Sequence, residues 1–348
     1  MSNTVVVGMS GGVDSSVTAA LLKEQGHRVI GLFMKNWDDG ACPATLDSED
    51  VARTSDLLQI PHYTVNFVQE YRDRVFASFL ADLKAGLTPN PDILCNKEIK
   101  FDLFLEKAIS LGADFLATGH YCRLDATHNL LKGSDPDKDQ SYFLHAVKQE
   151  AFRKVLFPIG DLHKKEVRSL ARKYNLPTSE KKDSTGICFI GKRDFKPFVA
   201  QYLGYQSGDF QTLSGEAVGR HDGAAYYTIG QRRGLGLGGE GEAWYVIGKD
   251  LPRNIVFVER GADHPSLFAP SLIASHLTWV GEPPATFPFR CTAKIRYRQT
   301  DQPCTLHPLE NQMKVLFDDP QRAITPGQSV VFYSGDLCLG GGTIVHSC

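Results

Sequence analysis

The sequence predicts an α/β protein in which a doubly wound parallel sheet is followed by a small β-rich central domain and a C-terminal β-barrel. Strand-like and helix-like runs alternate over residues 1–120, which is typical of a parallel sheet covered on both faces. After about residue 205, short β-rich runs alternate with glycine and proline turns. The length of 348 residues allows two or three domains with separate cores. We expect domains over residues 1–204, 205–268 and 269–348.

The chain opens with the apolar run 5–7, which is typical of a buried parallel strand. A turn rich in glycine and serine follows over residues 8–16. Glycine lets the backbone turn sharply and approach an anion closely, and the serines can cap a helix expected over residues 17–25. The free N–H groups of that helix would face a nucleotide phosphate. The alternative is a glycine-rich turn that binds no ligand.

The next runs complete the expected sheet, whose carboxyl-end edge holds the loop 8–16 and is where ligands bind in such folds. Further strands are expected over residues 28–34, 62–67 and 114–118. Helices are expected over residues 48–58 (capped by Asp47 or Ser48), 68–84, 96–111, 160–176 and 194–203, with a polar hairpin over 125–139. Strands of the β-rich part are expected over residues 226–229, 244–247, 255–259, 291–298, 314–317 and 329–333.

Composition narrows the class of protein. Hydrophobic residues make up 42% and charged residues 22% of the chain, as in ordinary globular proteins. No run of about 18 apolar residues occurs, and the first strand begins too early for a signal peptide, so we expect a cytoplasmic protein with no membrane span. We also expect a monomer. None of the eight cysteines forms a C-x-x-C pair, and the sequence shows no dedicated metal site.

The charge is unevenly distributed along a chain whose net charge is −2. Residues 148–196 carry 13 Lys/Arg and 6 Asp/Glu, so this stretch alone is positive by 7. One basic block in a nearly neutral chain is what a protein with a polyanion-binding face would show. The alternative is a solvated helix face, because Lys164, Arg168 and Arg172 fall on one expected helix.

Two cysteines lie in settings that favour a thiolate. Cys95 stands at the expected start of a helix, three residues after Asp92. Cys188 follows the basic block, with Lys181 and Lys182 close in sequence. The alternative for each cysteine is a small buried apolar residue.

The loop Ser10-Gly11-Gly12-Val13-Asp14-Ser15 resembles that of the ATP pyrophosphatase superfamily. It lacks the Lys-Ser/Thr of a Walker loop and the spacing of a dinucleotide fingerprint. Members of this superfamily cleave ATP between its α and β phosphates and use AMP to activate an oxygen atom.

Three further motifs, over residues 90–96, 184–190 and 227–236, resemble those of the tRNA-specific 2-thiouridylase family. The resemblance keeps its order from residue 5 to at least residue 327. It implies ATP with accompanying Mg²⁺, the anticodon arm of tRNA as partner, and adenylation of the O2 atom of the wobble uridine. Sulfur would arrive through a relay protein fed by a cysteine desulfurase.

The resemblance also implies residue roles. Cys188 would carry a persulfide and attack the activated carbon, and Cys95 would break the S–S bond, leaving a Cys95–Cys188 disulfide. Asp92 would act as general acid or base near a flipped-out base. ATP would be held by Gly8, Met9, Ser10, Gly11, Gly12, Val13, Asp14, Ser15, Met34 and Gly119. The tRNA would be held by Asn90, Pro91, Asp92, His120, Lys138, Asp139, Gln140, Arg296, Tyr297 and Gln328.

Several of these residues have structural alternatives when taken alone. His120 could be a core or loop histidine, residues 138–140 a solvated turn, and Arg296, Tyr297 and Gln328 ordinary exposed strand residues.

Two rival functions share part of the pattern. Another ATP pyrophosphatase acting on a small molecule would need neither Cys95 nor Cys188, and a non-catalytic RNA-binding protein would not need Asp92.

Overall fold

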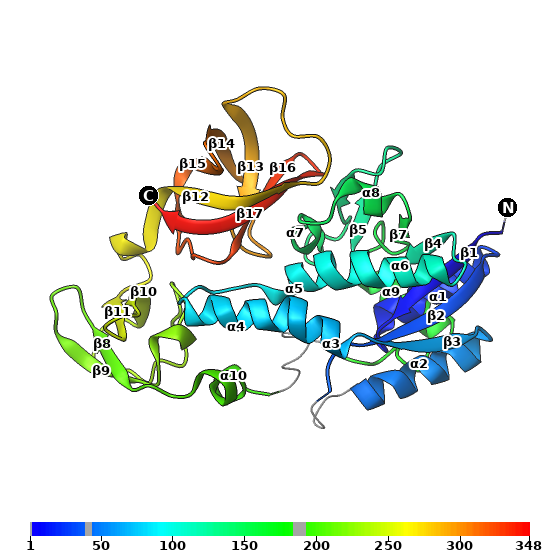
Figure 1. The fold of residues 1–348 in the computed structure, drawn as a ribbon, viewed down its shortest axis with the longest axis horizontal. Coiled ribbons are helices and arrows are strands. Elements are labelled where there is room, and N and C mark those ends of the chain that lie inside the picture. The colour runs from blue at the N-terminus through cyan, green and yellow to red at the C-terminus, as the bar shows by residue number, and fades with distance from the viewer. Residues whose placement is uncertain (1, 39–43, 184–192) are drawn as a thin grey trace.

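The computed structural model describes residues 2–38, 44–183 and 193–348. Its first domain is built on a five-stranded parallel sheet in the order β3-β2-β1-β4-β7 (Figure 1). The strands are β1 Thr4–Met9, β2 Arg28–Lys35, β3 His62–Asn66, β4 Phe115–Ala117 and β7 Val155–Leu156. The predicted fold class is therefore confirmed for this part of the chain.

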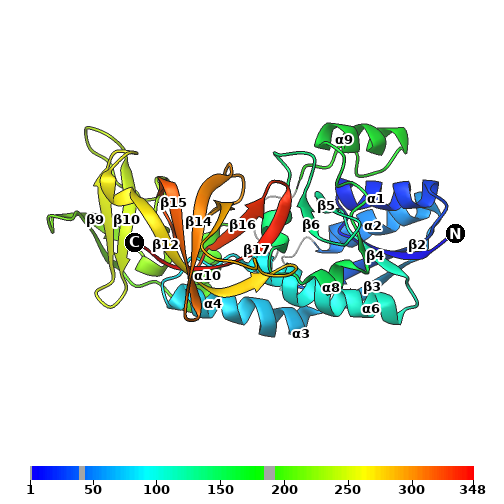
Figure 2. The same cartoon turned by 90° about the horizontal axis from the view of Figure 1, so that it is seen from above.

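Both faces of the parallel sheet are covered, as the alternation of side chains along β1 requires. Val5 and Val7 pack with α1 (Val13–Glu24), α2 (Ala44–Leu58) and α9 (Lys164–Lys173). Val6 packs on the opposite face, in the cluster that contains the helical residues Phe101 and Phe104. Figure 2 shows α1 and α9 on one side of the sheet and α6 (Phe104–Ser110) on the other.

Two predicted helix starts are wrong. The cap of α1 is Gly12, without a side-chain hydrogen bond, and the helix begins at Val13. The Ser15 and Ser16 hydroxyls instead donate to the carbonyl of Gly12, so the serines do not cap the helix. The helix α2 begins at Ala44, which places Asp47 in its first turn and rules out Asp47 or Ser48 as the cap.

The two long helices contain π-helical segments, which sequence periodicity does not indicate. The first runs through α3 Val68–Tyr71, a π segment Arg72–Phe76 and α4 Ala77–Lys84. The second runs through α5 Pro91–Leu94, a π segment Cys95–Leu103 and α6. Asn90 caps this second helix by accepting a hydrogen bond from the N–H of Asp92, and Pro91 occupies its first turn. Cys95 consequently lies one turn inside the helix and not at its start.

The central domain is a four-stranded sheet in the order β10-β11-β8-β9, preceded by α10 Phe195–Leu203. Its strands are β8 Gly208–Gln211, β9 Ala217–His221, β10 Trp244–Asp250 and β11 Ile255–Arg260. The strand predicted over residues 226–229 is wrong. The chain forms a 3₁₀ turn over Ala224–Tyr226 instead. Tyr226 and Tyr227 are buried and pack in the core, but they do not belong to a sheet.

The last domain is a closed antiparallel barrel, because β12 pairs with both β15 and β17 in the order β12-β15-β14-β13-β16-β17. A 3₁₀ turn, Pro265–Leu267, precedes it. The barrel strands are β12 Phe268–Trp279, β13 Phe289–Lys294, β14 Gln302–Leu309, β15 Gln312–Arg322, β16 Ser329–Ser334 and β17 Leu337–Ser347. The strand predicted over residues 291–298 ends at Lys294, so Arg296 and Tyr297 lie beyond it.

The first domain reaches the barrel through a hairpin that spans residues 122–132 and not the predicted range 125–139. Strands β5 Cys122–Leu124 and β6 Leu130–Lys132 pair with each other, and Leu131 pairs with Leu337 of β17. The Lys132 ammonium also binds the Asp301 carboxylate at 2.6 Å. Two short helices follow the hairpin, α7 Ser141–Leu144 and α8 Gln149–Phe152. None of the helices described here is long and apolar enough to cross a membrane.

Candidate active site

The turn between β1 and α1 is held by close backbone packing. Gly11 has φ of +71°, and a Cβ atom there would lie 2.5 Å from the carbonyl oxygen of Asp47. A Cβ atom at Gly119, just after β4, would lie 2.8 Å from the backbone nitrogen of Ser15. Both positions therefore need glycine. This packing places the N-terminal N–H groups of α1 at the carboxyl edge of the sheet, where an anion can bind them.

The residues predicted for ATP occupy this edge together. Residues 8–15 run from the end of β1 into α1, and Gly119 packs against them. Met34 lies near the carboxyl end of the neighbouring strand β2, one residue beyond the partner of Met9. This arrangement could hold a nucleotide with its phosphates at the turn.

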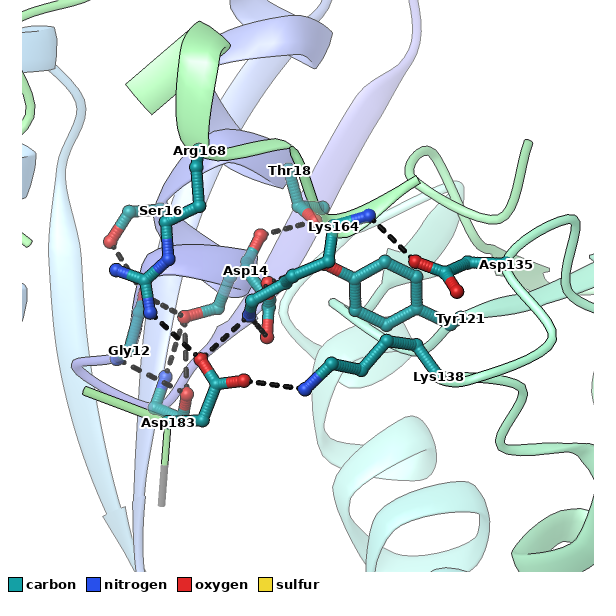
Figure 3. A network of polar contacts seen from close by, with 12 residues as sticks. Gly12, Asp14, Ser16, Thr18, Tyr121, Asp135, Lys138, Lys164, Arg168 and Asp183 are labelled. Atoms are coloured by element: carbon teal, nitrogen blue, oxygen red, sulfur yellow. Dashed lines mark hydrogen bonds and ion pairs between the residues drawn. The ribbon is translucent and has the colours of Figure 1, made fainter. Parts of the chain in front are cut away.

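A charged network lies beside the turn (Figure 3). The Asp14 carboxylate accepts a hydrogen bond from the Tyr121 hydroxyl at 2.8 Å and two from the Lys164 ammonium at 2.7 and 2.9 Å. Lys164 also contacts the Asp183 carboxylate at 2.8 Å. Lys138 and Arg168 bind the same Asp183 carboxylate at 2.6 and 2.9 Å. Partial burial alone would raise the pKa of Asp183, but the hydrogen bonds from Lys138 and Lys164 lower it to about 2.

Lys181 ties the turn to α2. Its ammonium donates to the Gly11 carbonyl at 2.9 Å and binds the carboxylates of Asp47 and Asp50 at 2.7 and 2.5 Å. Partial burial alone would lower the pKa of Lys181, but these two carboxylates raise it. Lys164, Arg168 and Lys181 were not among the predicted site residues. All three belong to the basic block over residues 148–196, which was the feature of the sequence that could have indicated them.

The helix that starts at Pro91 positions Asp92 and Cys95 on neighbouring turns, three residues apart and therefore on one face. Burial raises the pKa of Asp92, and the charge of Lys100 opposes this rise. Cys95 is 2% exposed and belongs to the apolar cluster of Trp37 and Ile99. Cys188 and the motif 184–190 lie outside the described residues.

The three domains meet at Thr88, two residues before the cap of this helix. The Thr88 carbonyl accepts a hydrogen bond from the Gln328 amide at 2.7 Å, and its N–H donates to the Pro326 carbonyl at 2.9 Å. The Thr88 hydroxyl lies 3.3 Å from that of Thr228 in the central domain. Gln328 thus contacts the segment that leads to Asn90, and it precedes β16, so it is not an ordinary strand residue.

The other predicted tRNA residues are less accessible than a solvated turn would be. Asp139 is 5% exposed and accepts hydrogen bonds from the N–H groups of Gly133 and Ser141 and from the Ser141 hydroxyl. The Gln140 side-chain oxygen accepts from the N–H of Tyr121. The interpretation of residues 138–140 as a solvated turn is therefore wrong, because their side chains bond to other segments of the protein.

His120, Arg296 and Tyr297 are also packed against the protein. The His120 ring lies 2.8 Å from the Thr118 hydroxyl and packs against Phe101, and burial lowers its pKa well below the usual value. Arg296 donates to the carbonyls of Arg322 and Ala323. Tyr297 packs on Phe143 with ring centroids 4.5 Å apart. Arg296, Tyr297 and Arg322 line a hollow of about 480 Å³ on the barrel.

Comparison with known proteins agrees with this architecture. The tRNA methyl transferase HUP domain family matches residues 3–192, the tRNA methyl transferase PRC-barrel domain family residues 196–260, and the aminomethyltransferase beta-barrel domain family residues 270–344. The parallel sheet and its glycine-rich turn thus define an α/β nucleotide-binding protein of the ATP pyrophosphatase class. That class uses ATP.

Full-length relatives narrow the class. The tRNA-specific 2-thiouridylase MnmA of Protochlamydia amoebophila is 61% identical over 98% of this chain and 93% of its own length. The enzyme of the same name from Halalkalibacterium halodurans is 58% identical over 98% of this chain and 94% of its own. The chain belongs to the tRNA-specific 2-thiouridylase family, as the motifs predicted.

The contact between the barrel and Thr88 can be tested with Gly327→Ala. Gly327 has φ of +89°, and a Cβ atom there would lie 2.8 Å from both Leu87 Cβ and the Thr88 backbone nitrogen. We expect the free energy of unfolding to fall by about 2–4 kcal/mol, from backbone strain and overpacking together. Gly335→Ala is the control, because Gly335 also has a positive φ of +58° but nothing lies within 4 Å of its Cβ position. Equal losses for the two variants in urea denaturation would show that the contact with Thr88 contributes nothing.

The raised pKa of Asp92 predicts a pH-dependent effect of Asp92→Asn. A carboxyl group with a raised pKa in the folded state makes stability fall as pH rises through that pKa. We therefore expect Asp92→Asn to be more stable than the parent at pH 7 and equal to it below about pH 3, where the carboxyl is mostly protonated in both states. Urea unfolding across this pH range measures the difference.

The control for Asp92→Asn is Asp102→Asn. Asp102 lies on the same continuous helix as Asp92, but its carboxylate is exposed and pairs with Arg74 of the neighbouring helix. A gain of equal size for Asp102→Asn, or a gain for Asp92→Asn that persists below about pH 3, would contradict the burial of the Asp92 charge.

Proposed function

We propose that this protein is an ATP-dependent tRNA 2-thiouridylase that adenylates the O2 atom of the wobble uridine and replaces that oxygen with persulfide sulfur. The observation that carries the proposal is the 61% identity to a protein of that name over 98% of this chain. A small-molecule synthetase would need neither the barrel nor the Asp92–Cys95 helix. A passive RNA-binding protein would not need the glycine-rich turn.

The first step is transfer of AMP to the base. The N–H groups at the start of α1 hold the phosphates of ATP, and Met34 and Gly119 line its adenosine side. The O2 atom of uridine attacks the α-phosphorus, and pyrophosphate leaves with the electron pair of the broken P–O bond. An amide-like oxygen is a poor leaving group, and bonding to AMP makes it a good one.

A divalent cation fits this edge of the site. The Asp14 and Asp183 carboxylates both reach the Lys164 ammonium, so two groups of the kind that bind Mg²⁺ flank one point. When bound with ATP, Mg²⁺ would neutralise phosphate charge. Within the described ranges, no group of three or more His, Cys, Asp or Glu side chains is placed to hold a metal ion.

The second step uses two thiols. The terminal sulfur of a persulfide on Cys188 attacks C2 of the base, and AMP leaves with the former O2 atom. The Cys95 thiolate then attacks the Cys188 sulfur, the S–S bond breaks, and its electron pair stays on the sulfur that becomes the thiocarbonyl. A Cys95–Cys188 disulfide remains, and a reducing thiol restores both groups. Asp92 lies one turn from Cys95, and its raised pKa suits it to hold or accept a proton at the base.

The tRNA contacts follow the edge shared by the domains. Asn90, Pro91 and Asp92 would touch the target base, which must leave the anticodon stack to react. His120, Lys138, Asp139, Gln140, Arg296, Tyr297 and Gln328 either reach the RNA directly or hold the segments that do. The partner that supplies sulfur is a relay protein charged by a cysteine desulfurase, and the enzyme acts as a monomer.

Replacing either thiol by a hydroxyl tests the function. We expect Cys188→Ser and Cys95→Ser to abolish formation of 2-thiouridine, because a hydroxyl neither carries sulfane sulfur nor opens a persulfide. Binding of tRNA should stay within about 2-fold of the parent, since neither change removes a cationic side chain that could contact phosphate. Mass spectrometry of tRNA nucleosides and a filter-binding assay measure the two quantities. Cys348→Ser at the exposed last residue is the control, and thiolation retained by Cys188→Ser would exclude Cys188 as the sulfur carrier.

A further inference from the structure

Three cationic side chains from two segments converge on one carboxylate. Lys138 comes from the loop after β6, whereas Lys164 and Arg168 stand one turn apart on α9. All three bind Asp183, at 2.6, 2.8 and 2.9 Å (Figure 3). Long cationic side chains lose conformational freedom when they are held in this way, so the convergence is costly unless it serves a charged ligand or a structural tie.

The position of the cluster favours a ligand. Lys164 also binds Asp14 in the first turn of α1, so the cluster adjoins the N–H groups that would hold phosphate. Lys138, Lys164 and Arg168 bring three positive charges to the two carboxylates of Asp14 and Asp183. The side chains of Lys164 and Arg168 are 14% and 22% exposed, which leaves them shielded from solvent but within reach of it.

A carboxylate that accepts from three charged donors occupies the kind of site that a phosphate group occupies. We propose that Lys138, Lys164 and Arg168 bind the β- and γ-phosphates of ATP and the pyrophosphate that leaves, and that Asp183 occupies this anion site when no phosphate is bound. The inference rests on the proposed function only in taking ATP as the nucleotide.

These cations would stabilise the negative charge that develops on the leaving pyrophosphate. When the bond between the α-phosphorus and its bridging oxygen breaks, negative charge grows on the β-phosphate. Cations already fixed beyond the glycine-rich turn stabilise that charge without reorganising. The turn alone cannot supply them, because residues 8–16 contain no Lys or Arg.

Binding of inorganic pyrophosphate, ATP and AMP to the full chain, measured by calorimetry without tRNA and without divalent cations, tests the proposal. Lys164→Gln and Arg168→Gln should weaken pyrophosphate and ATP binding by about 10- to 100-fold, as expected for a lost charged hydrogen bond. AMP binding should stay within about 2-fold, because AMP lacks the β- and γ-phosphates. Asp183→Asn should strengthen pyrophosphate binding, because the internal competitor loses its charge.

The control variant is Arg172→Gln on the same helix, where Arg172 pairs with Glu180 at the exposed surface. It should leave all three affinities unchanged. Lys164→Arg keeps the charge and should retain most of the affinity for pyrophosphate, which separates a lost contact from a folding defect. AMP binding reports independently that the nucleotide site is intact.

Three results would overturn the proposal. These are unchanged pyrophosphate affinity in Lys164→Gln and Arg168→Gln, equal losses for AMP and pyrophosphate, and weaker pyrophosphate binding in Asp183→Asn. Failure of the protein to thiolate tRNA would contradict the proposed function. The binding measurements would still test the phosphate site, because they contain no tRNA.

Discussion

Close backbone packing around the turn after β1 is the constraint on which the rest of the site depends. Gly11 lies against the Asp47 carbonyl and Gly119 against the backbone of Ser15, with no room for a side chain at either position. This packing fixes the N-terminus of α1 between α2 and the end of β4. It also brings Asp14 within reach of Lys164, which lies 150 residues later in the chain. Two strand ends, one helix start and the first turn of α9 thus meet at one edge of the sheet.

The second organising feature is the junction at Thr88. The catalytic domain supplies the helix of Asp92 and Cys95, while the barrel holds Thr88 through Pro326 and Gln328 and the central domain approaches it through Thr228. The position of the helix that carries Asp92 and Cys95 therefore depends on contacts from all three domains. Gln328, Asp139 and Arg296 act in the described structure mainly by holding other segments.

The order of strands and helices and the glycine-rich turn could be predicted because apolar periodicity and glycine act locally. Two helix starts could not be predicted, because Gly12 and Asn90 cap helices that were expected to begin at residues 17 and 96. The run 226–229 has strand-like composition, yet Tyr226 and Tyr227 are buried in a turn, where tertiary packing overrides propensity. The convergence of Lys138, Lys164 and Arg168 could not be predicted, because spacing along the chain says nothing of which distant carboxylate they meet.

A structure of the full chain bound to a non-hydrolysable ATP analogue tests the proposed binding of phosphate at this edge most directly. We expect the β- and γ-phosphates within hydrogen-bonding distance of Lys138, Lys164 and Arg168, with the Asp183 carboxylate displaced from at least two of them. Phosphates bound elsewhere, with Asp183 still holding all three cations, would contradict the account.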